Sequence, residues 1–141
     1  MFDITSQAVS ETAAIHIKSA TGEPLYADAE RTKPVRIVIY GPASKAFAGL
    51  ETRQATRSAA RLKANDGDYV PVTAEERQRD TADDLTMITA GFENFTYGDG
   101  GMSGPELYRA VYADPRLGFI TRQVVQSLGQ WSAFAGKSAA A

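Results

Sequence analysis

Residues 33–44 read Lys-Pro-Val-Arg-Ile-Val-Ile-Tyr-Gly-Pro-Ala-Ser and contain the clearest secondary-structure signal in the chain. The six residues 35–40 are rich in β-branched side chains and end on an aromatic one, while a proline precedes them and Gly-Pro follows. This pattern is typical of a β-strand bounded by turns. Because strand side chains alternate between faces, Val35, Ile37 and Ile39 are expected on one face of a sheet.

Two segments that precede this strand are interpreted as its neighbours in the sheet. Ile15 and Ile17 alternate with polar residues over 13–18, which favours a strand with one apolar face. The sequence Thr-Gly-Glu-Pro at 21–24 predicts a turn, and residues 25–28 are read as the returning arm of a hairpin. We therefore expect a small antiparallel sheet of two or three strands, which needs a helix to pack against it.

Helical patterns follow the strand. Residues 44–64 contain no proline and are rich in Ala, Arg, Lys and Leu, and a second helix is predicted over 73–90 behind a capping box formed by Thr73 and Glu76. Residues 65–72 between them are read as an exposed loop. The apolar residues at helical spacing in the first helix, which we expect to face the core, are Ala46, Phe47, Leu50, Ala55, Ala59 and Leu62.

Two further helices are predicted near the end of the chain. A short one starts at residues 103–106, Ser-Gly-Pro-Glu, and the last begins at Asp114-Pro115, with aspartate as N-cap and proline at the first helical position. A core-facing stripe is predicted in this last helix, because apolar residues repeat at spacings of three and four at Leu117, Ile120, Val124, Leu128 and Trp131.

These elements predict an α+β fold, with a small N-terminal antiparallel β-hairpin or sheet followed by a mainly α-helical part. Residues 1–12 are polar without periodicity and are interpreted as a flexible N-terminal arm. Residues 13–135 are interpreted as a single α+β domain, and residues 136–141 as a flexible tail. The total of 141 residues is enough for one domain with a core of its own.

Composition excludes several classes of protein. The chain has no cysteine, so it contains neither a disulfide scaffold nor a thiolate metal site nor a cysteine nucleophile. No apolar run approaches the roughly 20 residues that span a bilayer, and the N-terminus lacks the basic and apolar regions of a signal peptide. We therefore expect a cytosolic protein with no membrane partner. The net charge of −2 is not that of a dedicated nucleic-acid binder.

No set of residues in the sequence is typical of an enzyme. The single histidine, His16, has no second histidine or cysteine with which to share a metal ion. The turn Gly-Asp-Gly-Gly at 98–101 lacks the Gly-Lys-Ser/Thr of a phosphate-binding loop, and no Gly-x-Ser-x-Gly elbow is present. Asp80, Asp83 and Asp84 are interpreted as a solvated helix face, because one helix face offers a hard cation too few oxygens. We expect no catalytic residue, cofactor or metal site.

The one basic row in the sequence consists of Arg53, Arg57 and Arg61, which share a helix face at i, i+4 and i+8, together with Lys63. Such a row can face phosphates, an acidic partner, or the acidic helix around residues 75–84. No aromatic residue is interleaved with the row, so the stacking platform of single-strand nucleic-acid binders is missing. We do not expect nucleic acid to be the partner.

The aromatic residues Phe92, Phe95 and Tyr97, together with Met102, lie in an irregular stretch between predicted helices. One interpretation is that they fill the core between the flanking helices. The other is that they form a partly exposed apolar patch that binds another chain.

Four motifs of the C-terminal half together carry a family resemblance. They are Leu-Thr-Met-Ile-Thr-Ala-Gly-Phe-Glu-Asn-Phe at 85–95, the glycine turn at 98–101, Ser-Gly-Pro-Glu-Leu-Tyr-Arg-Ala-Val-Tyr-Ala-Asp-Pro at 103–115, and Phe-Ile-Thr-Arg-Gln-Val-Val-Gln-Ser-Leu-Gly-Gln-Trp at 119–131. In this order they resemble the tail assembly chaperones of long-tailed bacteriophages and prophages. The hairpin, the strand and the Arg-rich helix of the N-terminal half are similar to the same proteins.

The resemblance covers residues 13–135, with Phe92 where a tryptophan is common in the family. It implies a non-enzymatic chaperone of the host bacterial cytoplasm that binds the long, largely helical tape measure protein and helps to bring tail tube subunits to it. A homo-oligomer is compatible with this role. No family motif marks the contact residues. Chemistry alone suggests apolar contacts at Phe92, Phe95 and Tyr97 and a polar rim at Arg53, Arg57 and Arg61.

Two other functions stay open on the sequence alone. The chain can be a structural virion component, such as a minor tail or connector protein, which would remain in the finished particle while a chaperone would be absent from it. It can also be a small nucleic-acid-binding adaptor that uses the arginine row, in which case its binding to DNA would depend steeply on salt.

Overall fold

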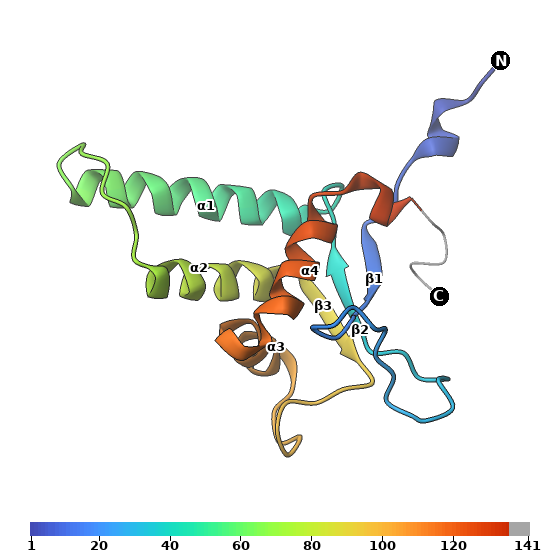
Figure 1. Ribbon diagram of the computed structural model, residues 1–141. Helices are drawn as coiled ribbons and strands as arrows, with labels where there is room; N and C mark the ends of the chain where they lie inside the picture. The colour runs from blue at the N-terminus through green and yellow to red at the C-terminus, as the bar shows by residue number, and fades with distance from the viewer. Residues whose placement is uncertain (136–141) are drawn as a thin grey trace.

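The predicted strand at residues 35–40 forms the centre of the sheet in the computed structural model, which describes residues 1–135 (Figure 1). Strand β2 (Arg36–Tyr40) pairs antiparallel with β1 (Thr12–His16) on one edge and with β3 (Thr89–Glu93) on the other. Within the described residues four α-helices accompany this sheet, so the predicted α+β class is confirmed. The segment 136–141, predicted as a flexible tail, lies outside the described residues.

The third strand comes from a region that the sequence pattern placed partly in a helix. The helix predicted over 73–90 is α2 (Ala74–Met87), and β3 follows it almost at once, with a bulge in the pairing to β2. Thr89 fixes the transition from helix α2 to strand β3 inside the core. Its hydroxyl group donates to the Leu85 carbonyl (2.7 Å) and shares a hydrogen bond with the Tyr112 hydroxyl (2.8 Å).

Residues 25–28, predicted as the returning arm of a hairpin, form no regular strand: Tyr26 makes one isolated antiparallel bridge to Pro34, and Pro24 just before them makes another to Lys18. Leu25 nevertheless connects the ends of the two neighbouring strands. Its N–H donates to the Ile17 carbonyl (3.0 Å), and its own carbonyl accepts from the Val35 N–H (2.9 Å) and from His16 Nε2 (2.8 Å). The single histidine therefore serves the fold at this end of the sheet.

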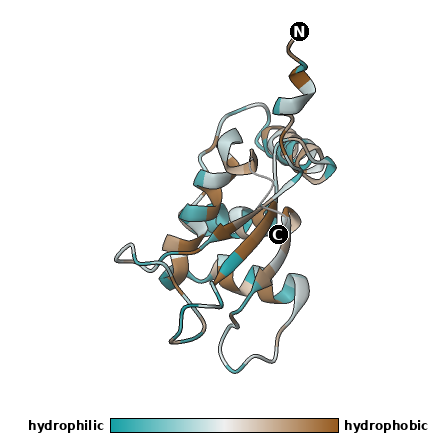
Figure 2. Ribbon diagram, turned by 90° about the vertical axis from the view of Figure 1, so that its right-hand side faces the viewer, coloured by the Kyte–Doolittle hydropathy of each residue, from teal (hydrophilic) through white to brown (hydrophobic). Residues whose placement is uncertain are grey.

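One face of the sheet forms the core. Ile15 lies opposite Ile37, and Ile37 lies opposite Phe92. Ile37 and Ile39 are buried while their neighbours in β2 are half-buried, so the predicted alternation of this strand is confirmed. Helix α4 (Gly118–Leu128) packs against β2, while α3 (Gly104–Ala113) packs against α2 and β3. Figure 2 shows hydrophobic residues gathered on the strands in the middle of the molecule. The core side chains with almost no exposed surface are Ala13, Ile17, Ile37, Ile39, Ala82, Ile88, Val111, Tyr112, Val124 and Phe134.

Helices α1 (Lys45–Ala64) and α2 run side by side away from the sheet and form a projecting α1–α2 hairpin (Figure 1). Each begins at a capping side chain. The Ser44 hydroxyl accepts from the Phe47 N–H (3.2 Å), and the Thr73 hydroxyl accepts from the Glu76 N–H (3.1 Å), as the capping box predicts.

The predicted apolar stripe of α1 does not reach the core along its whole length. Leu50 is the one residue of this helix that is buried. Ala55, Ala59 and Leu62 are exposed, so their assignment to the core is wrong. Helical periodicity indicates an amphipathic helix, but it does not show how far along that helix a partner surface extends.

The C-terminal segment is not the single helix predicted from residue 114 onward. A 3-10 turn at Pro115–Leu117 leads into α4, and a second 3-10 turn follows at Trp131–Phe134. Because the chain turns at Gly129, Phe134 is fully buried while Trp131 is exposed. The prediction of Trp131 in the core stripe is therefore wrong, since the helical period ends before it.

The segment predicted as an N-terminal arm contains a 3-10 turn at Ile4–Gln7 with no buried residue. Its last residues belong to the sheet region. The Ser10 N–H donates to the Phe134 carbonyl (2.8 Å), the Glu11 carbonyl accepts from the Gly41 N–H (2.7 Å), and Thr12 is the first residue of β1. Residues 10–12 thus lie beside the 3-10 turn at Trp131–Phe134 and lead into β1.

Gly41 offers a test of this packing, because an added Cβ there would lie 2.3 Å from the ring of Phe134. We expect Gly41→Ala to lower the free energy of unfolding by about 1–3 kcal/mol, since the fully buried ring has little room to move. Gly118→Ala is the matched control. Nothing lies within 4 Å of its Cβ and its backbone is already helical, so stability should stay equal or rise. Urea unfolding measures both variants, and equal stabilities would contradict this packing.

Candidate partner-binding surface

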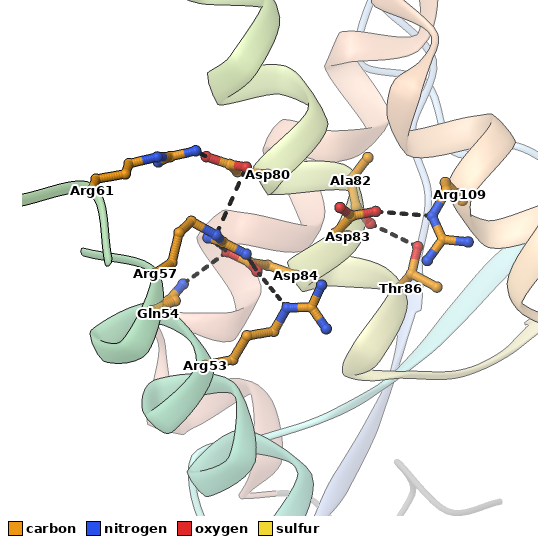
Figure 3. Close-up of polar contacts among 10 residues, drawn as sticks. All are labelled: Arg53, Gln54, Arg57, Arg61, Asp80, Ala82, Asp83, Asp84, Thr86 and Arg109. Atoms are coloured by element: carbon orange, nitrogen blue, oxygen red, sulfur yellow. Dashed lines mark hydrogen bonds and ion pairs between the residues drawn. The ribbon is translucent and has the colours of Figure 1, made fainter. Parts of the chain in front are cut away.

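The basic row of α1 faces the acidic face of α2 (Figure 3). Arg57 is central, because its Nη2 lies 2.6 Å from Asp84 Oδ1 and its Nη1 lies 3.1 Å from Asp84 Oδ2. Arg61 Nη2 lies 2.7 Å from Asp80 Oδ2. With longer ion pairs of 3.7 to 3.9 Å, these contacts complete an arginine–carboxylate ladder formed by Arg53, Arg57, Arg61, Glu76, Asp80 and Asp84.

The ladder follows from matched spacing on two antiparallel helices. The arginines recur every four residues on α1, and Glu76, Asp80 and Asp84 have the same spacing on α2. Residues at this spacing share one helix face, and the hairpin places the two faces opposite each other. Of the three surfaces that the arginine row could face, the acidic helix is therefore the one observed.

Asp84 is the most enclosed acid of the ladder, with 11% of its side chain exposed. Burial raises the pKa of this carboxyl group, but hydrogen bonds from Arg57 and Gln54 lower the pKa more, so it lies below the ordinary value of 3.8. Both carboxylate oxygens accept hydrogen bonds. Hydrogen bonds from Arg57 and Gln54 thus compensate the burial of the Asp84 carboxylate. Removal of its charge would leave Arg57 without its main partner.

We expect Asp84→Asn to lower the free energy of unfolding by about 2 kcal/mol, because a two-pronged, charge-assisted contact becomes a neutral one. Asp83→Asn on the same helix is the matched control. Its partner Arg109 is half-exposed, and exposed pairs contribute less than about 1 kcal/mol. Chemical unfolding of both variants measures the difference. Equal losses would show that the ladder does not hold the hairpin.

The lowered pKa of Asp84 makes the ladder sensitive to acid. Because the folded-state pKa lies below the unfolded value of 3.8, the stabilisation is complete above that value and is lost as the pH falls through the folded-state pKa. The stability of the wild-type protein should therefore decline below about pH 4, and D84N should decline less steeply. Unfolding curves at neutral and acidic pH measure the two slopes. Parallel slopes would assign the acid sensitivity to other groups.

The aromatic residues of the sequence prediction lie together at the edge of the core. Phe92 stacks on Phe95 with ring centroids 4.6 Å apart, and it also contacts the rings of Tyr108 (4.6 Å) and Tyr112 (6.0 Å). Phe92, Phe95 and Tyr97 are each half-buried and packed against buried residues. This arrangement favours the interpretation of these side chains as core packing, while their contact with a partner stays a prediction.

Tyr97 and Asp114 connect the aromatic segment to the C-terminal region. The Tyr97 hydroxyl donates to Asp114 Oδ2 at 2.9 Å. Hydrogen bonds from the side chain and backbone of Arg116, and from Tyr97, hold the pKa of Asp114 well below its usual range. Tyr97 therefore has a role within the fold, because it helps to fix the residue that caps the 3-10 turn before α4.

Large apolar residues are exposed at the far end of the α1–α2 hairpin. Tyr69 is 85% exposed, Val70 54% and Leu62 48%. Between the last turns of α1 and the following loop lies a groove of about 210 Å³, here called the tip groove. Exposed apolar surface of this kind is typical of a site that docks another chain. The groove is lined by Ser58, Arg61, Leu62, Asn65, Asp68, Tyr69, Val70 and Val72.

The loop that shapes the tip groove is held by hydrogen bonds to the end of α1. Asp66 (φ 54°) and Gly67 (φ 84°) take the left-handed conformation that ends many helices. The Gly67 N–H donates to the Leu62 carbonyl (2.9 Å), and the Asp68 N–H donates to the Asn65 carbonyl (2.9 Å). These bonds satisfy backbone groups at the helix end and give the loop a defined shape.

The sequence pattern does not reveal the tip groove, because it predicts a loop at residues 65–72 and places Leu62 in the core. The available signal was Tyr-Val-Pro-Val at 69–72, an apolar run inside a loop. The structure also does not join the predicted sites into one. Within residues 1–135, no hydrogen bond, ion pair or ring contact connects the arginine row with the aromatic segment.

No known protein family, curated protein or solved structure matches this chain. Over the described range 1–135, none of the helices has the length and apolar character needed to cross a membrane. In the same range no three His, Asp or Glu side chains form a group that could hold a metal ion. Asp80, Asp83 and Asp84 instead each pair with an arginine.

Proposed function

We propose that the chain is a non-enzymatic tail assembly chaperone of a long-tailed bacteriophage or prophage. In this role it binds the tape measure protein in the host bacterial cytoplasm and helps to recruit tail tube subunits. The observation that supports the proposal is the tip groove, which presents Leu62, Tyr69 and Val70 to solvent at the end of a projecting hairpin. The family resemblance of residues 13–135 supplies the identity of the partner.

The geometry of the hairpin suits a helical partner. A long amphipathic chain exposes apolar stripes before its own partners arrive, and such stripes aggregate unless another protein covers them. An apolar groove covers a stripe by accepting side chains that recur at helical spacing. Because the tip groove lies on a prefolded hairpin, binding needs no rearrangement of the core, and this chain loses little conformational entropy when the partner binds.

The arginine–carboxylate ladder favours a protein partner over nucleic acid. Binding to a phosphate backbone depends on cations that can replace its counterions. Arg57 and Arg61 instead contact Asp84 and Asp80 at 2.6 and 2.7 Å, so phosphates would first have to displace carboxylates. This arrangement weakens the support for a nucleic-acid-binding adaptor.

Size-exclusion chromatography with light scattering tests the proposal, with the protein alone and mixed with a tape-measure fragment encoded nearby. We expect a stable complex in which the fragment stays soluble. Tyr69→Ser/Val70→Ser should weaken the complex about tenfold or more while the protein stays folded, because both side chains are exposed. The matched control is Val125→Ser/Trp131→Ser, two exposed apolar residues outside the tip groove, which should keep full binding.

One outcome would contradict the chaperone function, and another would contradict the tip groove as its binding surface. If no complex forms and the protein is present in purified virions, the chain is a structural virion component and not a chaperone. If the tip variant binds normally but Phe92→Ser/Phe95→Ser stays folded and loses the fragment, the aromatic segment is the binding surface. Unfolding of that second variant would instead assign both rings to the core.

A further inference from the structure

We infer that the occupant of the tip groove is a basic amphipathic helix, whose apolar side chains enter the groove while its Lys or Arg side chains pair with carboxylates beside it. This inference rests on the proposed function and names the chemistry of the tape-measure segment that binds. Two observations carry it: an exposed face of α1 that leads into the groove, and an excess of unneutralised acidic residues around that face.

The exposed face of α1 has helical spacing of its own. Glu51, Ala55, Ser58 and Leu62 recur at i, i+4, i+7 and i+11, which places them on one side of the helix. All four are exposed. Because the distance between packed helices depends on the side chains at the contact, Ala55 and Ser58 allow a second helix to approach closely. This α1 stripe ends at Leu62, which also lines the tip groove.

Acidic residues lie at both ends of the α1 stripe. Glu51 lies at the end near the sheet, and Asp66 and Asp68 lie at the tip. All three are exposed, and none of them forms an ion pair within residues 1–135. The C-terminal end of a 20-residue helix adds negative partial charge at the tip. The surface is therefore complementary to a cationic partner.

The cations near the tip cancel only part of this charge. Arg61 lines the groove, but it already contacts Asp80 at 2.7 Å and Glu76 at 3.9 Å. Lys63 is exposed, forms no ion pair within residues 1–135 and, like Asp66, does not line the groove, so it offsets at most one of the three carboxylates. It also lies about 100° around the helix from Leu62. A helix with acidic flanks would meet an excess of carboxylates, whereas a basic one would pair with them.

The spacing of these carboxylates sets the expected pattern in the partner. From Glu51 to the end of α1 at Ala64 the helix rises about 20 Å. A partner helix that lies along the α1 stripe therefore needs Lys or Arg about four turns apart, with apolar residues at helical spacing between them.

Fluorescence anisotropy with two labelled peptides tests the inference on the full chain. Both peptides are helices of about 18 residues with the same leucines at i, i+3, i+4 and i+7, and they differ only in lysine or glutamate at the two flanks. We expect the lysine peptide to bind about tenfold more tightly, with a difference that shrinks at high salt. Equal affinities, or a preference for the glutamate peptide, would overturn the inference.

Asp66→Asn/Asp68→Asn is the matching change in the protein, because asparagine tolerates the left-handed backbone of Asp66. We expect this variant to bind the lysine peptide about fivefold more weakly and the glutamate peptide no worse than the wild type does. Asp99→Asn, in the exposed glycine turn away from the hairpin (Figure 1), is the control and should change neither affinity. An unchanged affinity in the double variant counts against the inference.

The outcomes separate this inference from the proposed function. If the tape-measure fragment needs Tyr69 and Val70 but tolerates D66N/D68N, the chaperone proposal stands and the basic helix is wrong. If the lysine peptide binds at the groove but the fragment does not, the surface chemistry is right and the tape measure protein is not the partner. Self-association that Leu62→Ser abolishes would make a second copy of the chain the occupant and overturn the inference.

Discussion

In the projecting α1–α2 hairpin, the contact between the Arg57 guanidinium and the Asp84 carboxylate holds the two helices together where no apolar interface does. Helical hairpins usually hold together through a shared apolar stripe, yet Leu50 is the one buried residue of α1. The ladder brings α1 to α2 beyond that point, so the position of the tip groove depends on it. The ladder uses the side of α1 that faces α2, so the opposite side of α1 stays exposed to solvent.

Local signals in the sequence predicted the elements better than their contacts. The β-branched run of β2 and the Thr73 N-cap of α2 depend on nearby residues, and both are confirmed. The sequence pattern does not predict strand β3, because Ala90 and Gly91 near its start have little strand preference. It forms because β2 offers an open edge and the core holds Thr89. The spacing of apolar residues places Trp131 in the core stripe, but the helix ends before it, at Gly129.

The candidate site shows the same division between local pattern and distant contact. The spacing of Arg53, Arg57 and Arg61 was visible in the sequence, but spacing on one helix does not show which surface lies opposite. The tip groove depends on left-handed backbone at Asp66 and Gly67, which turns the following loop back beside the helix. Asn-Asp-Gly-Asp at 65–68 indicates the end of a helix and a turn, but it does not show on which side of α1 the following loop lies. The apolar run at 69–72 is the signal that points to the groove.

The place of Phe134 in the chain has a consequence for synthesis. A nascent chain leaves the ribosome with its N-terminus first, so β1 and β2 emerge long before the side chains that cover them. Val124 and Phe134 are the last two fully buried residues of the described chain, and both belong to the core that encloses Ile37 and Ile39. Until they leave the ribosome, the nascent chain presents an uncovered isoleucine face. The proposed chaperone therefore exposes an aggregation-prone surface of its own during synthesis.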